Sequence, residues 1–304
     1  MKILGTGLDG LVGSRIVELL KNSYEFECSD VDITDKDLIS EKVIKSDAEI
    51  ILHMAAKTYV DGCEEDKDED IRISSYQNID EKEKAWIEKK TAWAVNVFGT
   101  QNIVDACKKS NKKIIYISTD FVFDGDNCPD DGYDEESVPS PINWYSKTKY
   151  EGEKIVQNSG VQWIIGRTAY PYRSNFARED FARRLIDAFR NGKELKMVTD
   201  HIMSPTFIDD IAVALDILIS KKQTGIFHIT GNQFVSPYKA ALLIAEEFEL
   251  DKSLIVETTR DEYFKGKAKR PFQLALKNDK IEKLGVQMRT FKEGLSEVRR
   301  QISL

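Results

Sequence analysis

The sequence predicts an α/β fold built on a doubly wound parallel sheet, with a smaller region after it. Three observations lead to this prediction. Short apolar runs alternate with longer amphipathic runs, a glycine-rich turn follows the first apolar run, and the alternation loosens in the second half of the chain. Short apolar runs are typical of buried parallel strands, and the amphipathic runs between them are typical of crossover helices. Such an alternation places helices on both faces of one sheet.

The expected elements follow one another along the first half of the chain. The strands are expected at Ile3-Leu4 and at residues 49–54, 113–117 and 162–165. The helices are expected at residues 12–20, where apolar side chains recur at helical spacing, and at residues 95–107. Beyond them, helices at 181–190 and 237–249 and a strand at 225–230 are expected.

The chain divides into two regions, residues 1–166 and residues 167–304. The second region is mostly helical, and some of its strands are expected to rejoin the main sheet. Residues 64–90 are dense in charge and predict a solvated surface excursion. Residues 124–141 are polar, with several Gly and Pro, and predict a loop.

Composition excludes several classes of protein. The 304 residues contain 44 Lys and Arg against 52 Asp and Glu, a net charge of −8, so the basic surface that binds nucleic acid is missing. No apolar run approaches the ~18 residues of a membrane span, and we expect no signal peptide before the first strand. The 4 Cys and 3 His are scattered, which predicts reduced thiols and no metal site. We therefore expect a cytoplasmic protein without nucleic-acid or membrane partners.

The first candidate site is the glycine-rich turn after the first strand. Gly7 and Gly10 allow a tight turn whose backbone N–H groups can approach a pyrophosphate, and Gly13 lets the next helix pack closely on the strand. The N-terminus of that helix faces the anion. The turn therefore predicts a Rossmann-like dinucleotide-binding domain, in which Leu11 and Val12 lie beside the cofactor.

Two acidic residues near the end of the expected second strand bear on the choice of cofactor. Asp30 lies twenty residues past Gly10, and Asp32 follows it. A carboxylate at this place can accept a hydrogen bond from a ribose hydroxyl and repels a 2′-phosphate. Because no arginine adjoins these residues, the sequence favours NAD(H) over NADP(H), and both cofactors stay open.

A tyrosine and a lysine four residues apart form the candidate catalytic pair. If a helix begins near Asn143, the side chains of Tyr145 and Lys149 share one face. An ammonium one turn away favours the phenolate, so that a tyrosine with an ordinary pKa of ~10 can exchange a proton with a carbonyl or alkoxide oxygen. Thr119 adds a hydroxyl at the carboxyl edge of the preceding strand, where open α/β sheets hold their ligands.

Taken together, these motifs resemble the dTDP-4-dehydrorhamnose reductase family of the extended short-chain dehydrogenase/reductase superfamily. The segments that match family patterns extend along nearly the whole chain and include residues 6–13 (TGxxGxxG), 32–35 (DITD), 55–61 (AAxTxVD), 95–102 (VNxxGTxN), 118–125 (STDYVFDG) and 141–149 (PLNxYGxTK). The chain departs from these patterns at Phe121, which replaces the usual Tyr, and at Trp144 and Ser146 beside Tyr145. The resemblance implies an NAD(P)H-dependent reductase of a 4-keto-6-deoxy nucleotide sugar in dTDP-rhamnose biosynthesis. Residues 1–166 would bind the cofactor and residues 167–304 the sugar nucleotide.

The same resemblance implies roles for single residues. Tyr145 would supply a proton while hydride reaches a sugar keto carbon, Lys149 would hold the nicotinamide ribose and tune Tyr145, and Thr119 would bond the keto oxygen. The implied cofactor residues, beyond the glycine-rich turn, are Asp30, Asp32, Ile33, Ala55, Ala56, Lys57, Tyr145 and Lys149. The implied substrate residues are Thr119, Asp120, Tyr145 and His201.

Two other functions stay open at this point. An NAD-dependent nucleotide-sugar epimerase uses the same three catalytic residues. A non-catalytic, cofactor-binding regulatory subunit, such as that of methionine adenosyltransferase, also resembles this family. A 4,6-dehydratase is disfavoured because Phe121 follows Asp120 where such enzymes have an Asp-Glu pair. Whether the chain forms a homodimer is left open.

Overall fold

The computed structural model describes residues 1–302 of the chain and separates into two compact units. The first unit comprises residues 1–122, 141–166 and 224–226. The second comprises residues 123–140, residues 167–223 and the described residues from 227 on. Neither unit is therefore a single stretch of chain.

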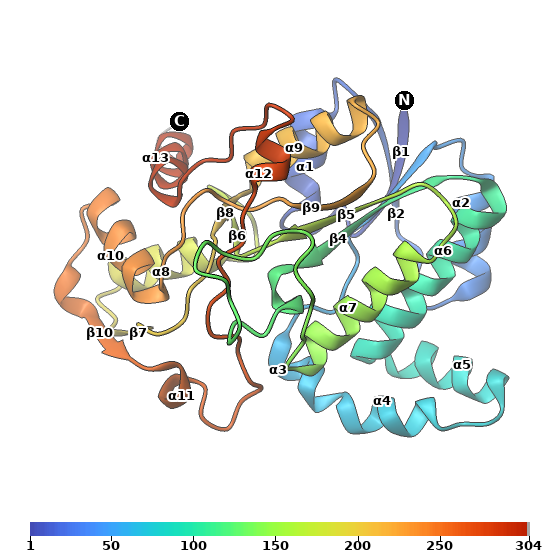
Figure 1. The fold of residues 1–304 in the computed structure, drawn as a ribbon, viewed down its shortest axis with the longest axis horizontal. Helices are drawn as coiled ribbons and strands as arrows, with labels where there is room; N and C mark the ends of the chain where they lie inside the picture. Colours follow the sequence, from blue (N-terminus) through green and yellow to red (C-terminus); the bar gives the residue numbers. More distant parts are fainter. Residues whose placement is uncertain (303–304) are drawn as a thin grey trace. The chain divides into compact units, whose positions relative to one another are not determined.

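A six-stranded sheet forms the centre of the fold, with the strand order β2-β1-β3-β4-β5-β9 (Figure 1). Its strands are β1 (Lys2–Thr6), β2 (Glu25–Ser29), β3 (Ile50–His53), β4 (Lys113–Thr119), β5 (Trp163–Thr168) and β9 (Gly225–His228). Strand β1 pairs in parallel with β2 and β3, and β3 pairs in parallel with β4. The order reverses between β1 and β3, which is the switch point of a doubly wound sheet. The predicted α/β, Rossmann-like fold is confirmed.

Three helices lie side by side against one face of this sheet (Figure 1): α2 (Lys36–Lys45), α6 (Gly99–Ser110) and α7 (Trp144–Gln157). Fully buried residues such as Ile39, Val156 and Ile114 join these helices to the strands in one apolar cluster. Helix α1 (Gly13–Leu20) connects β1 to β2. The expected helix at 95–107 is instead divided into a π-helical turn, η1 (Ala94–Phe98), and α6.

The charge-dense segment folds into three helices: α3 (Val60–Glu65), α4 (Lys67–Ser74) and α5 (Ile79–Lys89). We expected a solvated excursion, and the structure differs because one side of these helices is buried. Cys63, Asp70 and Ile73 are fully buried, and Trp86 packs its ring on Phe98 at 4.9 Å between centroids. The segment is thus part of the core of the first unit.

The second unit has two small parallel sheets, which pair β6 with β8 and β7 with β10. Its elements are β6 (Pro171–Tyr172), α8 (Phe181–Arg190), β7 (Leu195–Val198), β8 (Thr206–Phe207), α9 (Ile208–Ser220), α10 (Pro237–Glu247), η3 (Lys252–Leu254), β10 (Ile255–Thr258), α11 (Arg260–Tyr263), α12 (Asp279–Glu282) and α13 (Phe291–Ile302). The first unit also contains a short 3-10 turn, η2 (Asp120–Val122). The rings of Tyr172, Phe207 and Phe291 meet in its core. Within residues 1–302, every helix is too short or too polar to cross a membrane.

Gly152 sets how closely α7 approaches β4, and its replacement tests this packing. A Cβ there would lie 2.4 Å from the Tyr116 hydroxyl oxygen and 3.1 Å from the Asn96 carbonyl oxygen. We expect Gly152→Ala to lower the free energy of unfolding, because overpacking of about 1–3 kcal/mol exceeds a helix-propensity gain of about 0.5–1 kcal/mol. Urea denaturation measures the loss.

Tyr116→Phe removes the atom that the new methyl group meets. The double variant should therefore recover part of the stability that Gly152→Ala loses, and the coupling is read from a double-mutant cycle. Purely additive effects would contradict this account.

Candidate active site

The turn between β1 and α1 has the shape of a pyrophosphate cradle. Gly7 adopts φ +70°, and a Cβ on it would lie 2.8 Å from the Ala55 nitrogen. A Cβ on Gly13 would lie 2.6 Å from the Leu8 Cα, while the Gly10 N–H closes the turn on the Gly7 carbonyl at 3.2 Å. Among the described residues no side chain caps the N-terminus of α1. The turn therefore has the shape of a dinucleotide-binding turn, because a side chain at Gly7 or Gly13 would clash with the backbone that packs against it.

Two carboxylates follow β2 at the expected adenosine end of this cradle. Asp30 is exposed, whereas Asp32 is held by the protein. The amide and hydroxyl of Thr34 donate to Asp32 Oδ1 at 2.9 and 2.7 Å, and Lys90 Nζ lies 2.8 Å from Oδ2. Burial opposes ionisation of Asp32, but the hydrogen bonds from Lys90 and Thr34 outweigh it and hold the pKa of Asp32 below its usual range. The lysine that pairs with Asp32 was missed in the sequence because it lies far along the chain.

Helix α7 carries the candidate catalytic pair, and a capping box fixes where it starts. The Asn143 side chain accepts the Ser146 N–H at 2.8 Å, and the Ser146 hydroxyl accepts the Asn143 N–H at 3.2 Å. Because the helix begins at Trp144, Tyr145 and Lys149 lie one turn apart on one face. The helix expected near Asn143 is present.

Thr119, Tyr145 and Lys149 gather at the carboxyl end of β4. The Thr119 side chain lies close enough to the Tyr145 phenol to lower the pKa of that phenol. The Lys149 ammonium donates to the Ile117 carbonyl at 2.9 Å and lies 4.0 Å from the centroid of the Tyr116 ring. This is the edge at which doubly wound sheets bind ligands.

The protonation of this pair differs from our expectation. Burial raises the pKa of Tyr145 above its usual range, and the hydrogen bond with Thr119 offsets this only in part. Lys149 does not lower it, since its ammonium turns to a backbone carbonyl, and burial lowers the pKa of Lys149 itself to about 7. Tyr145 is therefore a neutral phenol at neutral pH, the form that donates a proton.

Unsatisfied polar atoms lie beside these three residues. Asp120 is buried and accepts the Thr119 hydroxyl on Oδ1 at 3.0 Å, and burial raises the pKa of Asp120 to about 7. Its Oδ2 atom and the Ser118 hydroxyl have no hydrogen-bond partner in the described part of the chain. Buried polar atoms without a partner are costly, so a polar ligand that bonded them would stabilise this part of the fold.

Asn96 ties the segment after β3 to the catalytic helix. Its Oδ1 accepts the Lys57 N–H at 2.8 Å, and its Nδ2 donates to the Lys57 carbonyl at 3.0 Å and to the Thr148 hydroxyl at 2.9 Å. Asn96 lies in η1, and π-helical turns are frequent at functional sites. The backbone that includes Ala55 and Ala56 is thereby fixed against α7.

The charge-dense segment of α3, α4 and α5 also contacts the start of α7. Glu64 Oε2 accepts the Trp144 backbone N–H at 2.7 Å, and Asp70 Oδ2 accepts the Trp144 indole N–H at 2.7 Å. Burial raises the pKa of Asp70. Asp66 binds the Lys57 ammonium at 2.6 Å, so the side chain of Lys57, a predicted cofactor residue, is already paired. These carboxylates act within the first unit.

His201 has a structural role in the second unit. We expected it to contact substrate, but it is only 2% exposed. Its Nδ1 lies 2.8 Å from the Pro271 carbonyl oxygen, and its Nε2 lies 3.0 Å from the Tyr170 hydroxyl. Because both ring nitrogens have protein partners, none is left for a ligand.

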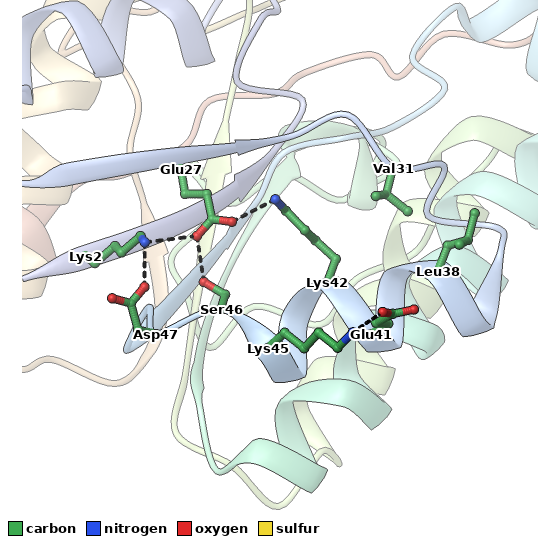
Figure 2. Close-up of a pocket in the computed structure, with 9 residues that line it drawn as sticks. All are labelled: Lys2, Glu27, Val31, Leu38, Glu41, Lys42, Lys45, Ser46 and Asp47. Atoms are coloured by element: carbon green, nitrogen blue, oxygen red, sulfur yellow. Dashed lines mark hydrogen bonds and ion pairs between the residues drawn. The ribbon is translucent and has the colours of Figure 1, made fainter.

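A surface pocket of about 470 Å³ lies beside α2 (Figure 2). Its lining is rich in charge and consists of Lys2, Glu27, Val31, Leu38, Glu41, Lys42, Lys45, Ser46 and Asp47. Figure 2 shows these charges paired with one another, with Lys2 between Glu27 and Asp47. The hydrogen bond from Lys42 lowers the pKa of Glu27 to about 2. No candidate site residue lines this pocket, and residues 1–302 contain no cluster of side chains suited to a metal ion.

Known proteins resemble the chain along its whole length. The family model described as the RmlD substrate binding domain matches residues 1–78 and 71–303. A dTDP-4-dehydrorhamnose reductase of Aggregatibacter actinomycetemcomitans is 29% identical over 98% of this chain and 98% of its own. Methionine adenosyltransferase 2 subunit beta of Mus musculus is 28% identical over 97% of this chain and 86% of its own. The crystal structure of dTDP-4-dehydrorhamnose reductase of Bacillus anthracis in complex with NADP is 27% identical, covers 99% of both chains and has a TM-score of 0.85.

The buried Lys149 predicts a pH-dependent stability of the cofactor-free protein. Its pKa of about 7 lies below the ordinary 10.5, so between these values the unfolded chain binds more protons and stability rises with pH. We expect Lys149→Met to raise the midpoint temperature of unfolding at pH 6, because it removes a buried charge. This rise in midpoint should shrink as the pH approaches 10, where the folded wild type holds Lys149 uncharged. Calorimetry across this range measures the difference.

Lys109→Met is the matched control, because Lys109 is exposed on α6. It should leave the midpoint nearly unchanged across the same pH range. A lower midpoint for Lys149→Met at pH 6 would show that burial of the ammonium does not destabilise the fold.

Proposed function

The chain belongs to the family of the RmlD substrate-binding domain, and we propose that it is an NAD(P)H-dependent reductase of a 4-keto-6-deoxy nucleotide sugar such as dTDP-4-dehydrorhamnose. One observation carries the proposal. The Thr119 hydroxyl, the Tyr145 phenol and the Lys149 ammonium gather at the carboxyl end of β4 in a unit that has a dinucleotide cradle. The reductases that resemble the chain along its whole length support it.

The cofactor residues follow from the fold of the first unit. The turn of Gly7, Gly10, Leu11, Val12 and Gly13 binds the pyrophosphate through backbone N–H groups. The loop of Asp30, Asp32 and Ile33 receives the adenosine, and the backbone of Ala55, Ala56 and Lys57 lines the cradle. Lys149 holds the nicotinamide ribose, which gives its buried ammonium the polar partner that a backbone carbonyl alone does not fully supply.

Tyr145 is the proton donor of the proposed reaction. The reduced nicotinamide, when bound, supplies the hydride to the keto carbon. As that carbon gains the hydride, the carbonyl π electrons move to oxygen, and Tyr145 gives this oxygen its proton to complete the hydroxyl. Its raised pKa keeps the phenol protonated until then. Water afterwards returns a proton to the phenolate.

Thr119 and Asp120 orient the sugar. The Thr119 hydroxyl donates to Asp120 Oδ1 in the structure. When the sugar binds, it turns this one proton to the keto oxygen and favours the negative charge that develops there. Asp120 offers the unpaired Oδ2 to a sugar hydroxyl. Both act from rigid backbone at the end of a buried strand, which keeps the reacting groups aligned.

Product analysis separates this function from its alternatives. The purified protein is incubated with NADH or NADPH and dTDP-4-dehydrorhamnose, and nicotinamide oxidation is followed together with the sugar product. One cofactor oxidised per sugar reduced supports the reductase. Altered sugar without net oxidation indicates an epimerase, and cofactor binding without turnover indicates a regulatory subunit like the methionine adenosyltransferase relative.

Tyr145→Phe tests the proton donor. We expect turnover to fall by about 10²–10⁴-fold, because general acid catalysis contributes that much. The dissociation constant of the cofactor should change by less than about twofold, since the ring and the helix stay in place. Stopped-flow turnover and calorimetric titration measure the two quantities.

Tyr150→Phe is the control on the same helix, because it removes a phenol that takes no part in the site. It should keep full turnover. Undiminished turnover in Tyr145→Phe would overturn the assignment of the proton donor.

A further inference from the structure

The charge-dense segment ends in a lysine, Lys90, whose side chain reaches the expected adenosine end of the cradle. Lys90 follows α5 as its C-cap residue, with φ 48°. Its side chain is 61% exposed, and its ammonium lies 2.8 Å from Asp32 Oδ2. A cation from a surface helix thus stands beside the loop after β2.

Asp32 has little capacity left to accept a hydrogen bond from a ribose hydroxyl. Thr34 takes its Oδ1 atom with two hydrogen bonds, and Lys90 takes its Oδ2 atom. A carboxylate with both oxygens engaged within the protein has less capacity for a further hydroxyl donor.

Asp30 lies beside the cradle, where the ribose of the adenosine is expected to bind. In the paired strands Thr6 lies opposite Ser29, so the next residues in register are Gly7 of the cradle and Asp30. Asp30 is exposed. Two residues of chain span at most about 7 Å, which keeps the partner of Asp32 in the neighbourhood of Asp30. The cradle edge therefore has two carboxylates and one ammonium.

We propose that Lys90 makes this edge accept the 2′-phosphate of NADPH, and so sets how well the chain uses NADPH relative to NADH. This inference rests on the proposed function, in which the cradle holds a nicotinamide cofactor. A phosphate monoester brings a charge of about −1.5 to −2. Without Lys90 it would meet two uncompensated carboxylates, whereas the lysine neutralises one of them and offers a mobile donor to the phosphate. A 2′-hydroxyl needs no such cation, so the lysine discriminates between the two cofactors.

Two nucleotides that contain only the adenosine end isolate this contact. Calorimetric titration of the full chain at low salt gives the dissociation constants of 2′,5′-ADP and 5′-AMP. Lys90→Met should weaken 2′,5′-ADP relative to 5′-AMP by about two- to fivefold, the range of an exposed ion pair. Lys90→Arg keeps the charge and should keep most of the preference. Asp32→Asn frees the lysine and removes a carboxylate, so it should shift the ratio towards 2′,5′-ADP.

Lys89→Met is the matched control, because it removes the same charge one residue away on the same exposed helix end. It should leave the ratio within about 1.5-fold of wild type, since a longer-range charge in water is screened. An equal loss for both nucleotides in Lys90→Met, or the same shift in Lys89→Met, overturns the inference.

The ratio of kcat/KM for NADPH over NADH gives a second readout. It should fall in Lys90→Met by a factor similar to the change in binding. If wild-type protein reduces the sugar but this ratio is unmoved by Lys90→Met, the role of Lys90 fails and the proposed function stands. If the protein binds both nucleotides with the expected lysine dependence but reduces no sugar, the proposed function fails and the role of Lys90 stands.

Discussion

The side-chain amide of Asn96 is the contact on which the arrangement of the first unit depends. Three hydrogen bonds from one buried residue join the backbone of Lys57 to Thr148 of α7. Leaving a buried amide unpaired costs about 1–3 kcal/mol, so the loop after β3 and the catalytic helix keep a single relative position. The site residues Tyr145 and Lys149 take their place from this link, and the capping box at Asn143 fixes their register along the helix.

Three acidic side chains of the charge-dense segment bind groups of the protein itself. Although its net charge of −8 suggests a solvated surface, Glu64 and Asp70 bind the two N–H groups of Trp144, and Asp66 pairs with Lys57. Each carboxylate accepts hydrogen bonds that a neutral side chain would make more weakly. The charge-dense segment therefore stabilises the helix that carries the candidate catalytic pair.

The parts of the fold that depend on local chemistry could be predicted from the sequence. The glycine-rich turn, the strand at 113–117 and the helix after Asn143 are examples, because strand patterns, glycine spacing and capping residues lie within a few positions of one another. The pairs Asp32–Lys90 and Asp70–Trp144 could not be predicted, since folding brings them together from distant parts of the chain. Helical spacing showed that Tyr145 and Lys149 share a face, but not that the Ile117 carbonyl would take the ammonium. Regular helical periodicity also could not predict the π-helical turn that contains Asn96.

One stretch of chain, α3 to Lys90, touches both the loop after β2 and the beginning of α7. It adds no strand to the six-stranded sheet, so its length and sequence are free to vary without changing the topology. Replacing this stretch with that of a relative would change its contacts with Trp144 and its ion pair with Asp32 at the same time. A redesign of this stretch therefore alters the surroundings of the loop after β2 and of the start of α7 together.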